Sequence, residues 1–206
     1  MNYLAHTALS PAQPQALIGN LLGDFMKGVD PQALYPDIRA GLANHRKVDA
    51  TTDQHTDVVK LKPLFQDHTR RFAGVAIDIY FDFLLCKHWH RYYALDLDDF
   101  IRQTYRLIDS ARHLVPSEPM RFALGRMTSQ NWFAAYRDED MIFRVIDRAA
   151  QRVRYRNRFG DSIADIERNR FDIEQAFLRL YPELMMLTGQ RSKQAIKNLT
   201  TYLHVS

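Results

Sequence analysis

Apolar residues recur every three or four positions along most of the chain, which is the period of an α-helix. Nothing in the pattern demands a β-sheet, so it predicts an all-α fold, a single-domain helical bundle. The predicted helices span residues 12–27, a segment from 37 onward, 58–65 with a break at Pro63, 69–92, 98–114, a segment starting near 116–119, 138–158, 163–180, and a short C-terminal segment beyond breaks at Pro182 and Gly189.

Two of the predicted helices carry charged residues on their apolar faces. In the helix that follows residue 37, His45 and Asp49 fall on the face defined by the apolar positions, and residues four apart share a helix face. In the helix over 69–92, Asp78 lies between two isoleucines and Asp82 follows one turn later. A charged group against an apolar surface is unfavourable unless it is paired or binds a metal.

Acids and imidazoles gather in three apolar blocks near the start of the chain. They are His6, Asp24, His45, Asp49, Asp53, Asp78 and Asp82. Carboxylate and imidazole donors suit Mn²⁺ or Mg²⁺ and are compatible with Fe²⁺ or Zn²⁺. Each residue alone has a structural alternative, since aspartate often caps helices and a histidine on an apolar face is often only hydrogen-bonded. As a set they predict a metal site.

Length and composition limit the number of domains, the kinds of cysteine site and the expected compartment. The chain has 206 residues with no Gly/Ser-rich or charge-run linker, which predicts one domain over residues 1–206. The single cysteine, Cys86, excludes a disulfide framework or a thiolate zinc site within one chain and points to a reducing compartment. No signal peptide or membrane span is recognisable, so we expect a cytoplasmic protein without membrane contact.

The net charge of +4 is modest, but part of it is concentrated in one segment. Arginines occupy positions 144, 148 and 152 and then 154, 156 and 158, and we expect them to form one basic stripe on the helix predicted over 138–158. Such a stripe is commonly a solvated face. Nucleic acid is disfavoured because interleaved aromatic residues are sparse, and an acidic protein partner fits at least as well.

Other catalytic classes lack sequence support. Neither a glycine-rich phosphate loop after a predicted strand nor a Gly-x-Ser-x-Gly elbow is present. A metal-activated water is then the remaining nucleophile. Arg46 lies beside His45, and a guanidinium is suited to binding phosphate oxygens. Asp49, Asp53 or a bound water is a candidate to protonate a leaving group.

Four blocks together resemble the acyl carrier protein phosphodiesterases. They are residues 2–6 (NYLAH), 19–25 (GNLLGDF), 45–53 (HRKVDATTD) and 77–82 (IDIYFD). Weaker similarity continues through His88 and Trp89 and on to Trp132, Tyr136, Arg137 and Asp138. Each block alone is loose, but their order and spacing are specific.

The resemblance implies an all-helical fold related to the HD-type metal phosphohydrolases. It implies removal of the 4′-phosphopantetheine arm from the serine of holo acyl carrier protein, with Mn²⁺ as the metal. Asp24, His45 and Asp78 match family positions expected to be catalytic or metal-binding. Together with the spacing argument, this predicts His6, Asp24, His45, Asp78 and Asp82 as metal ligands and Asp24, His45, Arg46, Asp49 and Asp78 as catalytic residues. The partner expected at Arg144, Arg148 and Arg152 is the acidic carrier protein.

Two departures from the family pattern bear on the ligand set. No adjacent His-Asp doublet is present, because Arg46 follows His45. Phe83 follows Asp82, where many relatives are expected to carry histidine. Two alternatives stay open at this point: the same metal site acting on a nucleotide or other small phosphoester, and a non-catalytic helical binding module whose acids pair with Arg46, Arg70 and Lys27.

Overall fold

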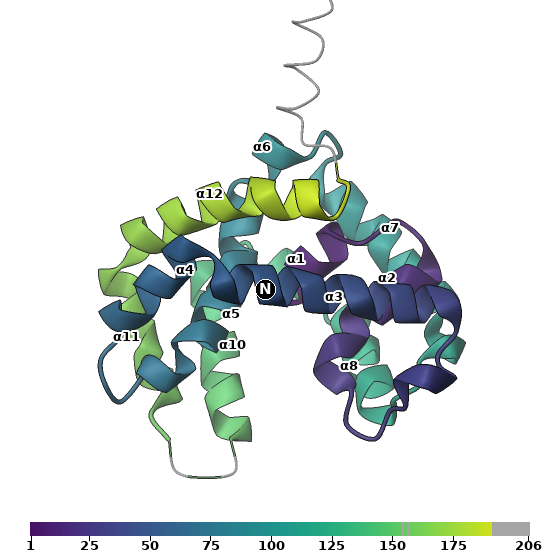
Figure 1. Ribbon diagram of the computed structural model, residues 1–206, viewed down its shortest axis with the longest axis horizontal. Coiled ribbons are helices and arrows are strands. Elements are labelled where there is room, and N and C mark those ends of the chain that lie inside the picture. The colour runs from purple at the N-terminus through teal and green to yellow at the C-terminus, as the bar shows by residue number, and fades with distance from the viewer. Residues whose placement is uncertain (154, 156, 191–206) are drawn as a thin grey trace, which may run out of the picture.

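The computed structural model describes residues 1–153, 155 and 157–190, and every regular element in that part of the chain is helical (Figure 1). The α-helices of the first half are α1 Tyr3–Ala8, α2 Pro14–Leu22, α3 Pro36–Gln54, α4 Thr56–Leu61, α5 Ala73–Lys87 and α6 Trp89–Tyr92. Those of the second half are α7 Leu97–Ser110, α8 Glu118–Ser129, α9 Trp132–Ala135, α10 Glu139–Arg152, α11 Ser162–Arg168 and α12 Arg170–Leu187. Short 3₁₀ turns are η1 Gly23–Phe25, η2 Pro31–Ala33, η3 Lys62–Leu64, η4 Arg70–Phe72, η5 Arg112–Leu114 and η6 Phe159–Asp161. The predicted all-α class is confirmed.

The helices differ from the predictions in several places. The segment 3–8 is a helix that the periodicity did not predict, because six residues are too few for a clear repeat. The segment 69–92 breaks at His88. The segment 163–180 breaks at Asn169, and α12 then runs through Pro182, so the break predicted there is wrong. The predicted C-terminal helix lies outside the described residues.

Helices α2 and α3 cross at a very short distance. A Cβ atom on Gly19 would lie 2.0 Å from the carbonyl oxygen of Ile38, and one on Gly41 would lie 2.2 Å from that of Ala16. Only glycine at both positions permits this approach, since any side chain would overlap backbone atoms. The crossing brings the middle of α3, with His45, against the end of α2.

A buried polar network ties the same helices to α1. The side-chain amide of Asn44 donates to the Asn20 side-chain oxygen at 2.9 Å and to the Leu9 carbonyl at 3.2 Å. Asn20 in turn donates to Ser10 Oγ at 3.1 Å. Buried amides with all partners in place fix one arrangement of the surrounding helices.

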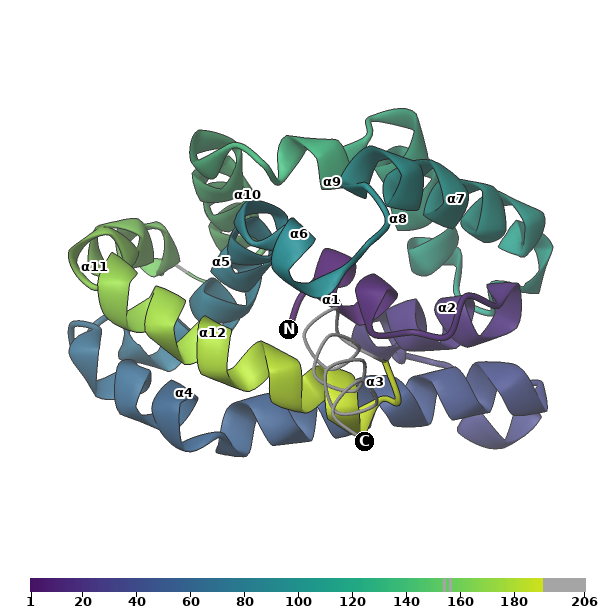
Figure 2. The same ribbon diagram turned by 90° about the horizontal axis from the view of Figure 1, so that it is seen from above.

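Helix α5 provides the centre of the core. Most of its residues are buried, and it packs against α1, α10, α11 and α12. Figure 2 shows α3 and α4 along one side of the molecule and α7 to α10 along the other, with α1 and α5 between them. Residues of α1, α3 and α5 therefore meet in the interior.

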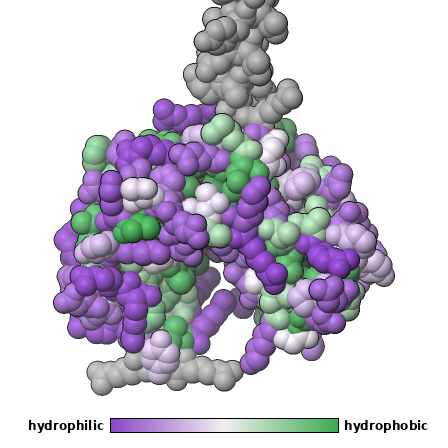
Figure 3. Space-filling view, in the orientation of Figure 1, coloured by the Kyte–Doolittle hydropathy of each residue, from purple (hydrophilic) through white to green (hydrophobic). Residues whose placement is uncertain are grey.

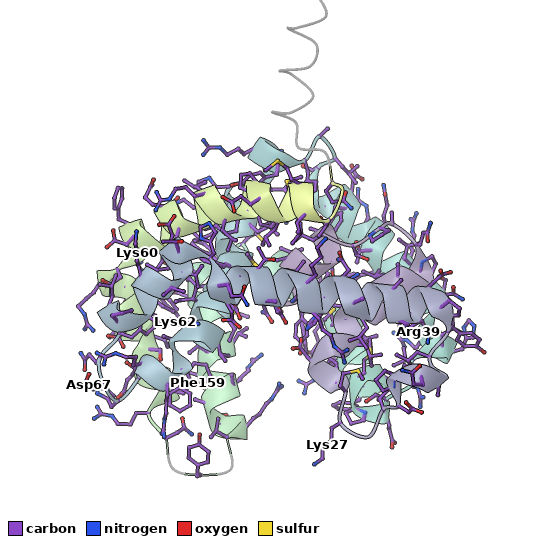
Figure 4. The ribbon with its side chains drawn as sticks, viewed as in Figure 1. Lys27, Arg39, Lys60, Lys62, Asp67 and Phe159 are labelled. Atoms are coloured by element: carbon purple, nitrogen blue, oxygen red, sulfur yellow. The ribbon has the colours of Figure 1, made fainter. Side chains whose placement is uncertain are left out.

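The surface is hollowed on one side between two projections (Figure 3). Lys27 lies on one projection, and Phe159 lies on the other (Figure 4). The N-terminal end of the chain lies by the middle of α3, at the closed end of the hollow (Figure 1). No helix in the described part of the chain is both long and apolar enough to cross a membrane.

Candidate active site

Two histidines and one aspartate meet beside the amino group of Met1, and this end of the chain lies at the closed end of the hollow (Figure 1). His6 Nε2 lies 3.0 Å from Asp49 Oδ1, and His45 Nε2 lies 2.9 Å from Asp49 Oδ2. The two imidazole rings stack with centroids 3.9 Å apart. His45 and Asp49 are one turn apart on α3, whereas His6 comes from α1. Both histidines are buried, and the Asp49 side chain is 39% exposed, which leaves the group open on one side.

The orientation of His45 is set by the backbone of α2. Its Nδ1 lies 2.7 Å from the Asn20 carbonyl oxygen, so Nδ1 carries the proton and donates. Nε2 then faces Asp49. Burial opposes a charge on His45, but the hydrogen bond and negative charge of Asp49 outweigh burial and raise the pKa of His45.

His6 is neutral at physiological pH, because burial lowers its pKa to about 4. The Asp49 carboxylate acts in the opposite direction and is outweighed. His6 Nε2 lies 3.0 Å from Asp49 Oδ1, but this contact does not have the geometry of a hydrogen bond. Both ring nitrogens of His6 are therefore buried without a hydrogen-bond partner in the described part of the chain. Buried polar atoms are normally satisfied, and such an orphaned pair calls for a group that is not protein.

Asp49 is held ionised. Burial favours its neutral form, but the close contacts with His45 and His6 and the positive charge of the Met1 amino group outweigh burial and hold the pKa of Asp49 well below its usual range. A proton donor needs a pKa near the working pH. Asp49 therefore does not suit the leaving-group acid role considered for it, whereas an ionised carboxylate between two imidazoles suits cation binding.

Asp24 lies in η1, next to Gly23. A Cβ atom on Gly23 would lie 2.0 Å from His45 Nε2, so η1 packs directly on that imidazole. The Asp24 side chain has an exposed surface, but protein surrounds it on the other sides, as expected in a cleft. The resulting desolvation raises its pKa despite the nearby His45.

Asp78 reaches the group from α5. Its Oδ1 lies 2.8 Å from the amino group of Met1, which is also 3.4 Å from Asp49 Oδ1. Burial raises the pKa of Asp78, and the amino group partly opposes this. A single positive charge thus bridges the carboxylates of α3 and α5, which shows that this position favours a cation.

Asp82 was expected to be a metal ligand, but its carboxylate binds the backbone of α1 instead. It is fully buried, and its two oxygens accept hydrogen bonds from the backbone N–H groups of Leu4 and Ala5 at 3.0 and 2.9 Å. These are unpaired donors of the first turn of α1, so Asp82 anchors that helix end. Burial raises the pKa of Asp82 to about 7, although the two amides oppose the shift.

The predicted ligand set is therefore brought together only in part. In the described part of the chain, His6, His45 and Asp49 are the group whose ligand atoms all lie within 4.8 Å of one another, and Asp24, Asp78 and Asp82 fall outside it. Asp49, which was predicted to be catalytic rather than a ligand, takes the central position. The pattern assigned it to the correct face of α3 but did not show that His6 would approach it.

Two further predicted residues lie away from this group. Arg46 is exposed, and within the described residues it has no recorded hydrogen bond or ion pair. The neighbouring position on a helix points about 100° away, so Arg46 does not face the same side as His45. Asp53 is exposed and pairs with Lys62 at 3.1 Å.

The basic stripe is shorter than predicted. Helix α10 ends at Arg152, and positions 154 and 156 lie outside the described residues. Arg158 follows the helix and pairs with Asp161 at 2.6 Å. Arg144, Arg148 and Arg152 remain exposed on α10, and no ion pair to any of them is recorded in the described part of the chain. Their positive charge is thus available on that wall of the hollow.

The pattern of the sequence missed the residues that position the histidines. Asn20 acts through its backbone carbonyl, which carries no residue-type signal. Gly23 lets η1 pack on His45 because it has no side chain. In the sequence, this glycine before Asp24 was the only indication of a close contact there. Tyr3 stacks on Phe25 with ring centroids 6.3 Å apart and joins η1 to the start of α1.

Comparison with known proteins places these residues in a family. The model of the family described as "Acyl carrier protein phosphodiesterase" matches residues 1–184. Proteins of that name are similar along nearly their whole length: one from Klebsiella pneumoniae subsp. pneumoniae is 35% identical over 195 residues, covering 93% of this chain and 99% of that protein. One from Enterobacter sp. is 32% identical over 189 residues, covering 90% and 96%, and one from Escherichia coli O157:H7 is 31% identical over 199 residues, covering 95% and 100%. No solved structure matches the chain. The family model and these relatives agree over the region that holds every residue of the site, and the chain belongs to the acyl carrier protein phosphodiesterase family.

Proposed function

We propose that this protein hydrolyses the phosphodiester that joins 4′-phosphopantetheine to the serine of holo acyl carrier protein. The products are apo carrier protein and 4′-phosphopantetheine. Family membership supports the substrate. The observation that carries the chemistry is the His6, His45 and Asp49 group, in which two buried imidazoles converge on one ionised carboxylate at the end of a hollow.

The three residues fit a divalent cation. His6 is neutral and has two buried nitrogens without a hydrogen-bond partner, and His45 is oriented by a carbonyl behind it, the arrangement usual for metal-binding histidines. Two nitrogens and a carboxylate suit Mn²⁺, with Mg²⁺ or Fe²⁺ as alternatives. When bound, such an ion would supply Lewis-acid stabilisation of charge on the phosphate oxygens.

Asp24 is our candidate for the proton donor. Hydrolysis adds water across the P–O(serine) bond: the hydroxyl oxygen joins phosphorus and a proton must reach the serine oxygen. A serine alkoxide is a poor leaving group, so protonation as the bond breaks is required. Burial raises the pKa of Asp24, so Asp24 keeps its proton to higher pH than an ordinary aspartate, and the preceding Gly23 packs directly on the His45 imidazole.

Asp78 and Asp49 share one positively charged partner. In this structure the charge is the Met1 amino group, at 2.8 Å from Asp78 and 3.4 Å from Asp49. We assign Asp78 the role of keeping the region between α3 and α5 negative, which draws a cation to the group. Arg46 and Asp82 stay predictions as functional residues, and their surroundings give them less support.

The partner surface is the wall formed by α10. Arg144, Arg148 and Arg152 are exposed one turn apart on that wall. Complementary charge speeds encounter with an acidic protein and fixes its orientation. We propose that the carrier protein binds across this wall, with its modified serine directed into the hollow.

Mass spectrometry of the carrier protein tests the proposal. Holo carrier protein is incubated with this protein and Mn²⁺, with and without a chelator in excess, and both products are weighed. We expect loss of the 4′-phosphopantetheine mass from the carrier with Mn²⁺ and an unchanged carrier after chelation. An unchanged carrier in both reactions would refute the activity, and equal hydrolysis in both would refute the metal dependence.

A further inference from the structure

A mostly apolar pocket lies beside the His6, His45 and Asp49 group. It has a volume of about 150 Å³. Tyr3, Trp132, Tyr136, Ala135 and Ala149 form much of its wall. Asn2 and Ile79 also line it, and they belong to the same two segments that carry His6 and Asp78. The pocket and the group therefore adjoin at the start of the chain and in the middle of α5, where Asn2 follows Met1 and Ile79 follows Asp78.

The mouth of the pocket carries positive charge. Arg148 and Arg152 line it from α10, and both are exposed with no ion pair recorded in the described part of the chain. Tyr3 lines the same pocket as these arginines. Burial raises the pKa of Tyr3 well above its usual value, the negative charge of Asp24 adds to the rise, and the positive charge of Arg152 opposes it. The tyrosine hydroxyl is therefore in the field of both groups.

We propose that this pocket binds the pantetheine arm of the substrate. The inference rests on the function proposed above, because hydrolysis at the His6, His45 and Asp49 group places the phosphorus there. The pocket adjoins the position of the phosphorus and is too small for a folded protein. The phosphate joins the carrier-protein serine to the pantetheine arm, so the pocket binds the arm.

The chemistry of the arm matches the lining. Beyond the phosphate ester, the pantetheine arm is uncharged and carries two methyl groups, one hydroxyl, two amides and a thiol. Aromatic and aliphatic walls suit its methyl groups and methylenes, as in most small-molecule sites. The guanidinium groups of Arg148 and Arg152 lie at the mouth, where the phosphate of the same molecule is negatively charged, and guanidinium binds phosphate well.

Tryptophan fluorescence gives a direct test of binding. Trp132 lines the pocket, whereas Trp89 is fully buried elsewhere and provides a constant background. Titration with 4′-phosphopantetheine should give a saturable change in emission that inorganic phosphate does not give and that Trp132→Phe removes. The same response to both probes, or a response that survives in Trp132→Phe, would overturn the proposal.

Filling the pocket gives the second test. Ala149→Leu on α10 and Ala135→Leu on α9 narrow the pocket from two helices, so that one variant remains if the other does not fold. Each should weaken 4′-phosphopantetheine binding and raise KM for holo carrier protein at least about tenfold.

The matched control is Ala164→Leu, on the exposed face of α11. It should behave as wild type in every assay. Folded variants with wild-type affinity for 4′-phosphopantetheine would overturn the pocket assignment. A wild-type protein that binds 4′-phosphopantetheine at Trp132 but leaves holo carrier protein intact would instead refute the proposed activity, so the two failures are distinguishable.

Discussion

Gly23 and the imidazole of His45 are in such close contact that a Cβ atom on Gly23 would lie 2.0 Å from His45 Nε2. The contact joins the turn that carries Asp24 to the helix that carries Asp49. It makes the absence of a side chain at position 23 part of the site, because a methyl group there would occupy the place of the ring.

Gly23→Ala should displace His45 and reduce kcat for holo carrier protein by about a hundredfold, the usual effect of misplacing a catalytic group by about 1 Å. Mn²⁺ affinity should fall in the same variant. The control is Gly125→Ala on α8, where the nearest atom to a new Cβ is a flexible arginine end at 3.9 Å. Wild-type kcat in Gly23→Ala would show that His45 does not need its present position.

Asp24→Asn should lose activity and keep its fold. Asp24 has an exposed surface and no recorded hydrogen bond in the described part of the chain, so little stability depends on it. Loss of a proton donor typically reduces kcat by about 10²–10⁴. The variant should keep wild-type affinity for the carrier protein, and Asp67→Asn, a distant exposed substitution, should be neutral. A drop in thermal stability with kcat intact would argue for a structural role instead.

Arg144→Glu should weaken carrier-protein binding without touching the pocket, because Arg144 does not line it. We expect KM for holo carrier protein to rise about two- to fivefold, as for one exposed charge pair, with the effect fading at high salt. Hydrolysis of a small diester should be unaffected. Arg39→Glu, on the far end of α3, is the control (Figure 4). Equal effects of both reversals would mean that only net charge matters.

Asp82 should make the protein less stable as pH rises from about 4 to 7. Its carboxyl is held protonated in the folded state by burial, which raises its pKa to about 7, whereas in the unfolded chain it ionises with a pKa near 3.8. The folded state therefore binds the extra proton in this interval, and its stability falls with pH by roughly a few kcal/mol at most.

Urea unfolding of metal-free protein from pH 4 to 8 measures this effect. Asp82→Asn should be less stable than wild type at pH 4, because only one acceptor remains for the Leu4 and Ala5 amides. Its stability should then decline less with pH than that of wild type. Parallel pH profiles for the two proteins would place the titration elsewhere.

The sequence predicts the site best where its residues are one turn apart. His45 and Asp49 lie on one face of α3 because the helical repeat puts them there, and that was evident from their spacing. His6 reaches them only because Asp82 binds the first turn of α1, a contact between distant segments that leaves no local signal. The same contact occupies Asp82, which the spacing argument had assigned to the metal.

Helix ends were less predictable than helices. Pro182 removes one hydrogen bond, and the predicted break did not occur because Tyr181, Leu184 and Met185 are buried against the rest of the core and hold α12 together. Arg158 was expected on α10, but Val153 adopts an extended conformation that ends the helix. The relation to HD-type phosphohydrolase folds stays a prediction.

Calorimetric titration with Mn²⁺ tests the central claim most directly, because the claim is that His6, His45 and Asp49 together hold a divalent cation. We predict saturable, stoichiometric binding to the wild-type protein and its loss in His6→Gln, with the fold of the variant confirmed by circular dichroism. Absence of binding to the wild-type protein, or equal binding to His6→Gln, would contradict it.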